Sequence, residues 1–193
     1  MKPSTHLGSK LNLFSIRLHL SDETSDSILA ETAGQSAGDY ENLNVELSGL
    51  GSPWTVYTLL ELVKLHRSGL VFLSETKCKA RRVDRLNEKF NYHGIGVDLA
   101  GKGSGLSLVW RKDVDVWLQS FSGNHIDVMV KSDDCPMPWH FTGVYGNPDI
   151  ARRKETWDHL RRLAKASERP WLCGGEFNEI FGQHEKQGLL PRA

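Results

Sequence analysis

The sequence predicts a single α/β domain in which helices pack outside a core of two β-sheets. The chain has 193 residues, which is room for one domain of ordinary size with a substantial core. Its periodic segments follow the order helix, strand, helix, four or five strands, helix and strand. That order fits helices on the outer faces of two stacked sheets, and no repeat with a period of about 20 to 50 residues indicates a solenoid instead.

Composition excludes several classes of protein. Apolar residues make up 39% and charged residues 25% of the chain, as in globular proteins, and no apolar run is long enough to span a bilayer. The formal net charge is zero, but residues 1–48 hold three basic and seven acidic residues, which leaves 21 basic and 17 acidic residues in the remainder. The remainder is therefore mildly basic, which permits a polyanionic partner without requiring one.

Cysteine usage and the N-terminus bear on the compartment. Cys78, Cys135 and Cys173 are widely spaced and include no C-x-x-C pair, which argues against a disulfide framework or a zinc ribbon. The N-terminus lacks the basic-then-apolar layout of a secretion signal. We therefore expect an intracellular protein of the nucleus or cytoplasm that is not secreted, and no obligate protein partner is evident.

The first part of the chain is expected to lie outside the domain. Residues 1–40 are rich in Ser, Thr, Gly and Asp, which predicts a disordered or poorly ordered extension ahead of a domain over residues 41–193. Within that extension, the alternating segment 12–18 could pair as a strand. Residues 42–47 are a second, short strand candidate.

Two helices and a buried strand are expected next. Ser52 can cap a helix that begins at Pro53, and Ser68-Gly69 ends it. Residues 70–73 form an apolar strand, and a second helix is predicted over about residues 79–90.

Alternating segments dominate the following part of the chain. They predict an antiparallel meander with strands at residues 92–98, 106–110, 114–121 and 126–130. After a loop at residues 133–138, a further strand ends at Tyr145. A helix over residues 150–167 then places four apolar residues inward, namely Trp157, Leu160, Leu163 and Ala164, and the last strand begins at Trp171.

Three of these strands deliver polar groups where they end. Glu75 closes one apolar run and Tyr145 closes another, while Glu176 and Asn178 follow Gly174-Gly175 at alternate positions. Carboxylates are the hard oxygen ligands that divalent-metal phosphoryl chemistry requires, so Glu75 and Glu176 could hold a metal. Asn178, Tyr145 and Asn147 could then donate hydrogen bonds to phosphate oxygens. In the alternative interpretation, Glu75 pairs with Lys77, and Glu176 is an ordinary surface residue.

Other constellations fit less well. The glycine cluster at residues 101–105 lacks the Lys-Ser/Thr ending of a phosphate-binding loop. Ser122, His125 and Asp127 lie close in sequence, but no nucleophile-elbow pattern accompanies them. The eight histidines show no zinc-ligand spacing. The basic faces of the helices are compatible with solvent or with nucleic acid.

A set of longer motifs makes the chemistry more specific. In order, these are LVFLSETK at 70–77, GLSLVW at 105–110, NHIDV at 124–128, WHFTGVYGNP at 139–148, RKETWDHLR at 153–161 and PWLCGGEFNEI at 170–180. Together they resemble the endonuclease/exonuclease/phosphatase superfamily. More narrowly, they are similar to the endonuclease domain at the front of LINE-type (non-LTR) retrotransposon proteins of plant genomes. The likeness covers about residues 47–190.

The resemblance implies a four-layer α/β sandwich, like that of deoxyribonuclease I, which uses Mg²⁺ to cleave phosphodiester bonds of DNA and possibly RNA. By motif, Glu75 matches the metal-binding glutamate of the family. Tyr145 matches the tyrosine that contacts the scissile phosphate, and Asn178 matches the asparagine that helps to hold it. Glu46 aligns with an asparagine near the metal, where it could serve as a second ligand.

Two departures from the family pattern bear on activity. The family has aspartate where this chain has Glu176, and one extra methylene displaces the carboxylate by roughly an ångström, which can reduce the rate about 100-fold. The chain also ends at Ala193, ahead of the Ser-Asp-His segment that supplies the catalytic histidine of the family, so we expect the C-terminal part of the second sheet to be missing. General acid–base help alone is typically worth about 10²- to 10⁴-fold.

The sequence therefore predicts a retrotransposon-derived, Mg²⁺-dependent DNA-nicking domain with weak or no activity. One alternative is a nucleic-acid-binding or partner-binding module without catalysis. Another is a phosphatase of the same superfamily that acts on a soluble phosphate ester or a phosphoinositide.

Overall fold

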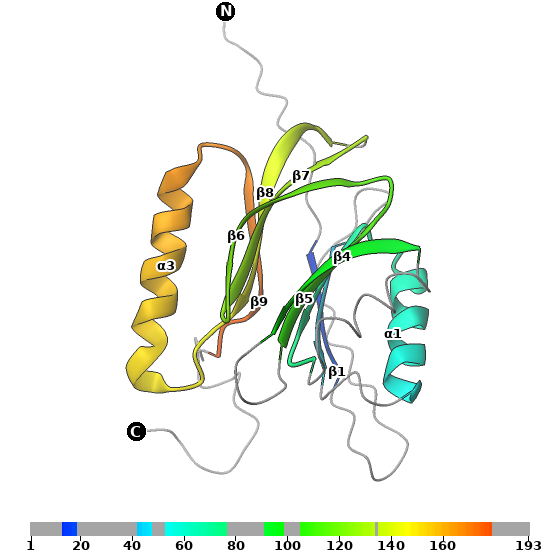
Figure 1. Ribbon diagram of the computed structural model, residues 1–193, viewed down its shortest axis with the longest axis horizontal. Coiled ribbons are helices and arrows are strands. Elements are labelled where there is room, and N and C mark those ends of the chain that lie inside the picture. Colours follow the sequence, from blue (N-terminus) through cyan, green and yellow to red (C-terminus); the bar gives the residue numbers. More distant parts are fainter. Residues whose placement is uncertain are drawn as a thin grey trace, which may run out of the picture.

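Two β-sheets face each other, and among the described residues one helix lies on the outer face of each sheet (Figure 1). The computed structural model describes residues 13–18, 42–47, 53–76, 91–98, 105–133 and 135–178, the first two ranges as backbone alone. Figure 1 shows the resulting four layers, helix, sheet, sheet and helix. This arrangement confirms the α/β sandwich expected from the sequence. The helix predicted over residues 79–90 lies outside the described residues.

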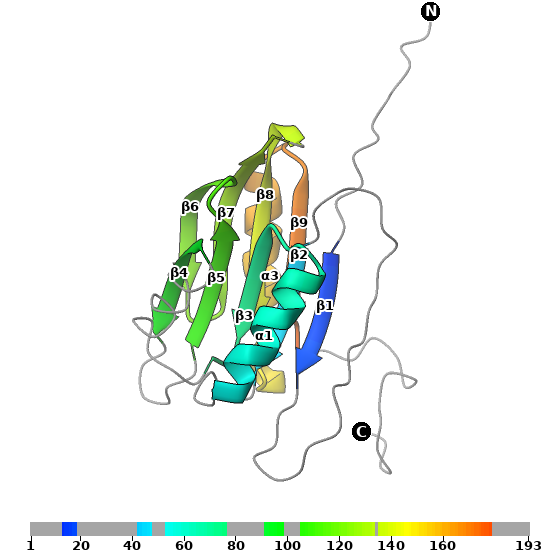
Figure 2. The same cartoon turned by 90° about the vertical axis from the view of Figure 1, so that its right-hand side faces the viewer.

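The first sheet combines parallel and antiparallel strands. Its order is β1 (Leu13–Leu18), β2 (Asn42–Leu47), β3 (Leu70–Ser74), β5 (Gly105–Arg111) and β4 (Tyr92–Asp98). β1, β2 and β3 run parallel, whereas β5 is antiparallel to both of its neighbours. β1 lies at one edge of this sheet (Figure 2) and falls within the N-terminal segment whose alternation allowed a strand.

The helix α1 (Pro53–Leu65) makes the crossover between the parallel strands β2 and β3. It begins at Pro53, as the sequence predicted, and buries Leu59 and Val63 against the sheet. Arg67 ends it in the left-handed conformation (φ 46°), where the amide of Ser68 donates to the carbonyl of Val63. The chain then enters β3, all five residues of which are buried.

The second sheet has the order β6 (Asp115–Ser122), β7 (His125–Ser132), β8 (Cys135–Tyr145) and β9 (Trp171–Glu176). β6, β7 and β8 are antiparallel, and β9 runs parallel to β8. The prediction of one continuous meander is wrong, because β4 and β5 belong to the first sheet and the chain changes sheets after Arg111. The first five residues of β5 are all buried, so both faces of the strand must be shielded from water. A position next to β3, in the interior of the first sheet, meets this requirement.

The predicted loop at residues 133–138 is also wrong in part, since β8 already begins at Cys135. β9 pairs only with residues 140–145 of β8. Among the described strands, residues 135–139 therefore have a partner, β7, on one side only, and a side without a partner tolerates the missing amide hydrogens of Pro136 and Pro138.

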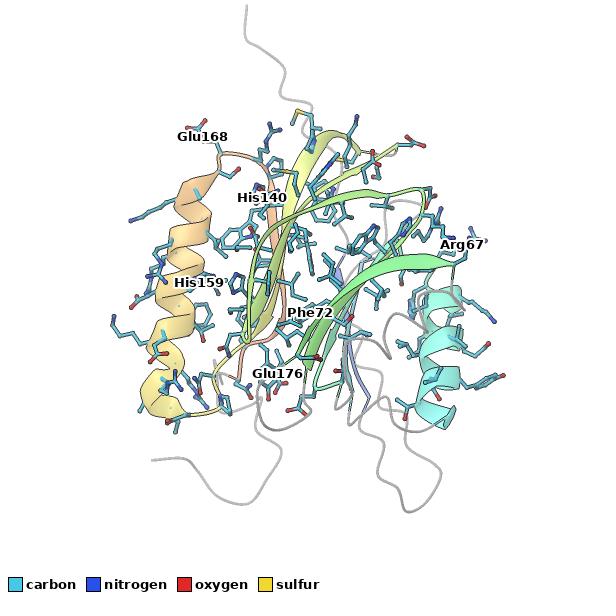
Figure 3. The ribbon with its side chains drawn as sticks, viewed as in Figure 1. Arg67, Phe72, His140, His159, Glu168 and Glu176 are labelled. Carbon is cyan, nitrogen blue, oxygen red and sulfur yellow. The ribbon has the colours of Figure 1, made fainter. Side chains whose placement is uncertain are left out.

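A phenylalanine of one sheet packs directly on glycines of the other. Phe72 of β3 is 1% exposed and lies between the sheets (Figure 3). A Cβ atom built on Gly143 of β8 would lie 2.2 Å from the Phe72 ring, and one built on Gly175 of β9 would lie 3.0 Å from it. The ring therefore occupies space that any other residue at position 143 would fill, so the two sheets are in direct contact at Phe72.

The outer face of the second sheet is covered by a short 3₁₀ turn, η1 (Ile150–Arg152), and by α3 (Arg153–Ala166). Leu160 is buried beneath the helix as predicted, and Trp157 and Leu163 are half-buried. The prediction that Ala164 faces the core is wrong. Ala164 is exposed because it lines an open groove beside β9, the edge strand of the sheet.

A histidine pair joins α3 to the sheet. His125 of β7 is 5% exposed, and its ring centroid lies 4.1 Å from that of His159 on α3. The two Nε2 atoms are 3.2 Å apart, and hydroxyl groups of Ser120 and Ser122 contact the two ring nitrogens of His125. Burial lowers the pKa of His125 to about 4, and the pKa of His159 is also lowered, first by burial and then by Arg162. Both rings are therefore neutral at pH 7.

Replacing Gly143 with alanine should destabilise the fold, because the added methyl group meets the Phe72 ring. We expect Gly143→Ala to lower the free energy of unfolding by about 1–3 kcal/mol, measured by urea denaturation. The matched test is the double variant Phe72→Leu with Gly143→Ala. Its loss should be smaller than the two single losses combined, since leucine leaves room for the methyl group; strictly additive losses would contradict the proposed contact.

Acidification should weaken the attachment of α3. An unfolded histidine binds a proton near pH 6.5, whereas His125 in the fold stays neutral until about pH 4, so the unfolded state binds more protons and stability falls as the pH falls. We expect a loss of about 1 kcal/mol between pH 6.5 and 5.5 in urea titrations, and a flatter dependence for His125→Gln. The pKa of the buried Asp127 is raised in the fold, so at this group the folded state binds more protons and acidification increases stability. This opposite contribution limits the expected loss to the pH range above the titration of Asp127.

The control is His93→Gln, at an exposed position of β4. This variant should keep the slope of the unaltered protein. An unchanged slope for His125→Gln would show that the histidine pair does not carry the pH dependence.

Candidate functional site

Three strand ends meet at one edge of the sandwich. Glu75 follows β3, Tyr145 ends β8 and Glu176 ends β9, where Tyr145 and Glu176 are paired in register. The hydroxyl of Tyr145 donates a hydrogen bond of 2.6 Å to Oε1 of Glu75, across the gap between the sheets. All three side chains are half-buried, and Figure 3 shows Glu176 near the lower ends of the two sheets. The structure thus brings together three of the residues predicted from the sequence.

The turn after β9 adds Asn178 to this group. The amide of Gly146 donates to the carbonyl of Glu176 (2.6 Å), and Nδ2 of Asn178 donates to the carbonyl of Gly146 (2.7 Å). A Cβ atom at Gly146 would lie 1.9 Å from the carbonyl oxygen of Phe177, so only glycine fits there. The turns that follow β8 and β9 are therefore tied to each other through their backbones.

Two residues of the site have an unusual backbone conformation. Glu75 and Asn178 both have φ 53°, in the left-handed region that residues other than glycine rarely adopt. Asparagine tolerates this region, whereas glutamate has no such preference. Such conformations are maintained only where the surroundings determine them, and they concentrate at functional sites.

Negative charge surrounds Tyr145. Its pKa is raised above the usual value by burial, then by the hydrogen bond to Glu75 and by the charges of Glu75 and Glu176, while a hydrogen bond with Asn178 opposes the shift. Tyr145 therefore keeps its proton throughout the physiological range and acts as a donor. Because its hydroxyl has one proton, Tyr145 can contact a phosphate oxygen only after its bond to Glu75 opens.

Three supporting contacts were not predicted from the sequence. Thr76 is buried, and its amide and hydroxyl both donate to the carbonyl of Gly105, which fixes the turn that carries Glu75. Asn124 accepts from the amide of Tyr145 (2.8 Å) and donates through Nδ2 to its carbonyl (2.9 Å). The sequence indicated only a turn at Asn124, since its partner lies 21 residues away.

The third contact links α3 to the site. The rings of Trp157 and Phe177 are stacked, with centroids 5.6 Å apart and planes 12° from parallel. Phe177 lies between Glu176 and Asn178 in sequence. The stack therefore holds the turn after β9 against the helix.

The remaining predicted residues have different surroundings. Oδ1 of Asn147 accepts from the amide of Asp149, and Asp149 in turn caps η1, so the amide oxygen of Asn147 belongs to the turn that starts the helix. Glu46 lies on β2 in register with Ser74, next to the end of β3, but its side chain is outside the described part. Lys77, the alternative partner of Glu75, is also outside it.

The donor set suits a hard cation. Glu75 and Glu176 supply carboxylate oxygens at a partly exposed edge, which is the ligand type that Mg²⁺ prefers while it keeps several waters. Within the described ranges, no group of three or more His, Cys, Asp or Glu residues forms a complete protein cage for a metal ion. The residues present therefore fit an open site of one or two carboxylates.

The alternative Ser-His-Asp constellation is not assembled. Ser122 contacts Nδ1 of His125 at 2.8 Å, but Asp127 accepts from the hydroxyl of Thr142 at 2.6 Å instead. Asp127 also lies 3.9 Å from Nδ1 of His140, beneath α3. Of these residues, His125, Asp127 and Thr142 are buried polar groups of the second sheet, whereas Ser122 is exposed.

Comparison with known proteins agrees with this architecture. The sequence model described as "Endonuclease/Exonuclease/phosphatase family" matches residues 42–193. Among solved structures, the endonuclease domain of TRAS1, a telomere-specific non-LTR retrotransposon, is similar with a TM-score of 0.58 at 14% identity, over 74% of this chain and 62% of that one. A functionally unknown conserved protein from Enterococcus faecalis has a TM-score of 0.54 at 14% identity, over 73% and 68% of the two chains.

A third similar structure is humanized D. rerio TDP2, with a TM-score of 0.52 at 16% identity, over 71% of this chain. The present chain spans 61% of that structure and 62% of the TRAS1 domain. No curated protein matches the sequence. In the part of the chain that the structure describes, no helix is long and apolar enough to cross a membrane.

Asn178 should stabilise the site turn through both its side chain and its backbone conformation. Asn178→Gly loses the side-chain hydrogen bonds to Gly146 and Tyr145, whereas Asn178→Ala loses the same bonds and also places alanine at φ 53°, so we expect alanine to be the more destabilising by about 1 kcal/mol in urea denaturation.

Asn91 provides the matched comparison, because it is exposed and has φ 58°. Asn91→Ala should also be less stable than Asn91→Gly by a similar margin. Asn178→Gly should lose about 1 kcal/mol more than Asn91→Gly, and equal losses would contradict a role for the Asn178 side chain.

Proposed function

The chain belongs to the endonuclease/exonuclease/phosphatase family, and from that premise we propose that it hydrolyses phosphodiester bonds in DNA, at a low rate and with Mg²⁺. The observation that carries the proposal is the hydrogen bond between Tyr145 and Glu75, which joins the two sheets at the edge where Glu176 and Asn178 also lie. RNA is the alternative nucleic-acid substrate. The motif resemblance further supports an origin in non-LTR retrotransposons.

Glu75 is the residue best placed to hold the metal. Its carboxylate lies at the open edge and is oriented by Tyr145, and β2 carries Glu46 next to the end of β3 as a further carboxylate. Mg²⁺, when bound, supplies a positive charge that polarises the phosphoryl group and stabilises the negative charge of the transition state. The left-handed backbone of Glu75 is held by the buried Thr76, so the carboxylate is positioned before substrate arrives.

Tyr145 and Asn178 are proposed to bind the phosphate. Burial and the nearby carboxylates keep Tyr145 protonated, so its hydroxyl would donate to a phosphate oxygen if Glu75 served as a metal ligand and released it. Asn178 lies in the turn that Phe177 anchors on α3, and its amide is within hydrogen-bonding reach of Tyr145. These two donors would orient the scissile phosphate between the sheets.

Glu176 is proposed to position the attacking water and to limit the rate. It ends β9 opposite Tyr145, and by the motif resemblance it stands where the family has aspartate. The side chain of glutamate is one methylene longer, so the carboxylate does not lie where the shorter acid would hold a water molecule. We expect a displacement of that size to reduce the rate by about 100-fold.

The proposal predicts slow, Mg²⁺-dependent nicking of supercoiled plasmid DNA by the purified chain. Glu75→Gln should abolish nicking because the amide cannot replace the carboxylate as a ligand, and EDTA should have the same effect. Glu176→Asp should raise the rate, by up to about 100-fold, since it restores the shorter acid. Gel electrophoresis of relaxed and supercoiled forms measures both changes.

Glu61→Gln is the control, because Glu61 is half exposed on α1, away from the site. This variant should nick DNA at the original rate. Nicking that survives Glu75→Gln would indicate a contaminating nuclease or a different site. Release of phosphate from small phosphate esters, with plasmid left intact, would favour a phosphatase instead.

A further inference from the structure

An apolar groove lies between α3 and the edge strand β9. Its volume is about 370 Å³, and it is lined by three aromatic rings, Trp157, Trp171 and Phe177, together with Leu160, Arg161 and Cys173. On β9, Trp171 and Cys173 alternate with residues that face the other way, and Phe177 continues the same alternation. The groove therefore follows the last strand from its start to the turn that carries Asn178.

Trp171 offers a fixed aromatic surface in this groove. Its indole NH donates to the hydroxyl of Thr142 at 2.8 Å, and Thr142 in turn donates to the buried Asp127. The ring is nevertheless 36% exposed. Because the indole NH is already hydrogen-bonded, the ring loses little conformational entropy when a planar group stacks on its exposed surface.

The net positive charge of α3, beside the groove, favours an anionic partner. α3 carries five Lys or Arg residues and two acidic ones over 14 residues. Arg161 contacts Asp158 and also lines the groove, with a side chain that is 68% exposed. A second copy of the chain would bring an equally basic helix against this one, so charge complementarity disfavours self-association and favours a polyanion.

We propose that this groove binds an unpaired base of a nucleic-acid strand, stacked on Trp171, while Arg161 contacts the adjacent phosphate. Single-stranded nucleic acid combines the two chemistries that the groove offers, since flat apolar rings alternate with anionic phosphates. Because the groove ends at Phe177, next to Asn178, the strand would continue toward the candidate site. The inference rests on the proposed function and specifies its substrate as DNA with an unpaired segment.

The test measures binding without metal, so that hydrolysis plays no part. Fluorescence anisotropy in EDTA compares a labelled single strand of about 12 nucleotides with a blunt duplex of equal length, both long enough to cover a groove of this size. We expect the single strand to bind more tightly. Trp171→Ala should weaken that binding roughly tenfold, whereas Trp171→Phe should retain most of it because the ring is kept. Arg161→Ala should reduce the slope of log affinity against log salt by about one.

Two matched variants separate the groove from the general surface. Trp117 on β6 is 48% exposed, and Trp117→Ala should leave binding unchanged. Lys64 on α1 is 68% exposed, like Arg161, and also contacts an acid three residues earlier, so Lys64→Ala is the charge control. Equal effects of the control and groove variants would overturn the proposal, as would unchanged binding by Trp171→Ala.

Analytical ultracentrifugation of the same proteins tests whether the groove instead binds a second copy of the chain. A dimer that dissociates in Trp171→Ala, with unaltered binding of the oligonucleotide, would assign the groove to self-association and overturn the proposal. Failure of the reaction is distinguishable from failure of the groove. If binding depends on Trp171 but no nicking occurs, the proposed hydrolysis is contradicted and the groove proposal stands. If nicking depends on Glu75 but binding does not change in Trp171→Ala, the groove proposal is contradicted and the proposed hydrolysis stands.

Discussion

The packing of Phe72 on Gly143 and Gly175 sets the separation of the two sheets, and the rest of the structure depends on it. The ring takes up the volume that side chains would need at both glycines. Glu75 follows Phe72 by three residues, Tyr145 follows Gly143 by two, and Glu176 follows Gly175 directly. A larger spacing between the sheets would therefore move Glu75 away from Tyr145, and the hydrogen bond that joins them could not form.

The site is built from strand ends, but its geometry is maintained by residues behind them. Thr76 holds the turn after β3, Asn124 holds Tyr145 by its backbone, and the Trp157–Phe177 stack holds the turn after β9. Each of these contacts connects segments that are 20 or more residues apart in sequence, as 29 residues separate Thr76 from Gly105. The two left-handed residues, Glu75 and Asn178, are possible because these contacts determine the backbone on both sides of the gap.

Much of this could be predicted from the sequence, because apolar runs and turn signals are local. The positions of α1, β3, β4 and β9 follow from them. The approach of Glu75 to Tyr145 and Glu176 joins two different sheets, so it is predicted from the chemistry of these residues and from the motif resemblance and not from strand periodicity. The division of the strands between two sheets could not be predicted in this way. Whether β5 pairs with β3 or with β6 depends on cover for both of its faces, which periodicity does not specify.

The glycines beside the site carry a consequence for how such a domain changes over generations. At Gly143, Gly146 and Gly175 a side chain would collide with Phe72, with the Phe177 carbonyl or with the Val144 carbonyl. These collisions threaten folding whether or not the protein cleaves anything. In a lineage without selection for catalysis, one acid could replace another at position 176, but substitution of the three glycines would still be selected against because it would disrupt the fold. The presence of the three glycines in a relative would therefore indicate that the fold is maintained. Only the site carboxylates, at positions 75 and 176, would indicate selection for catalysis.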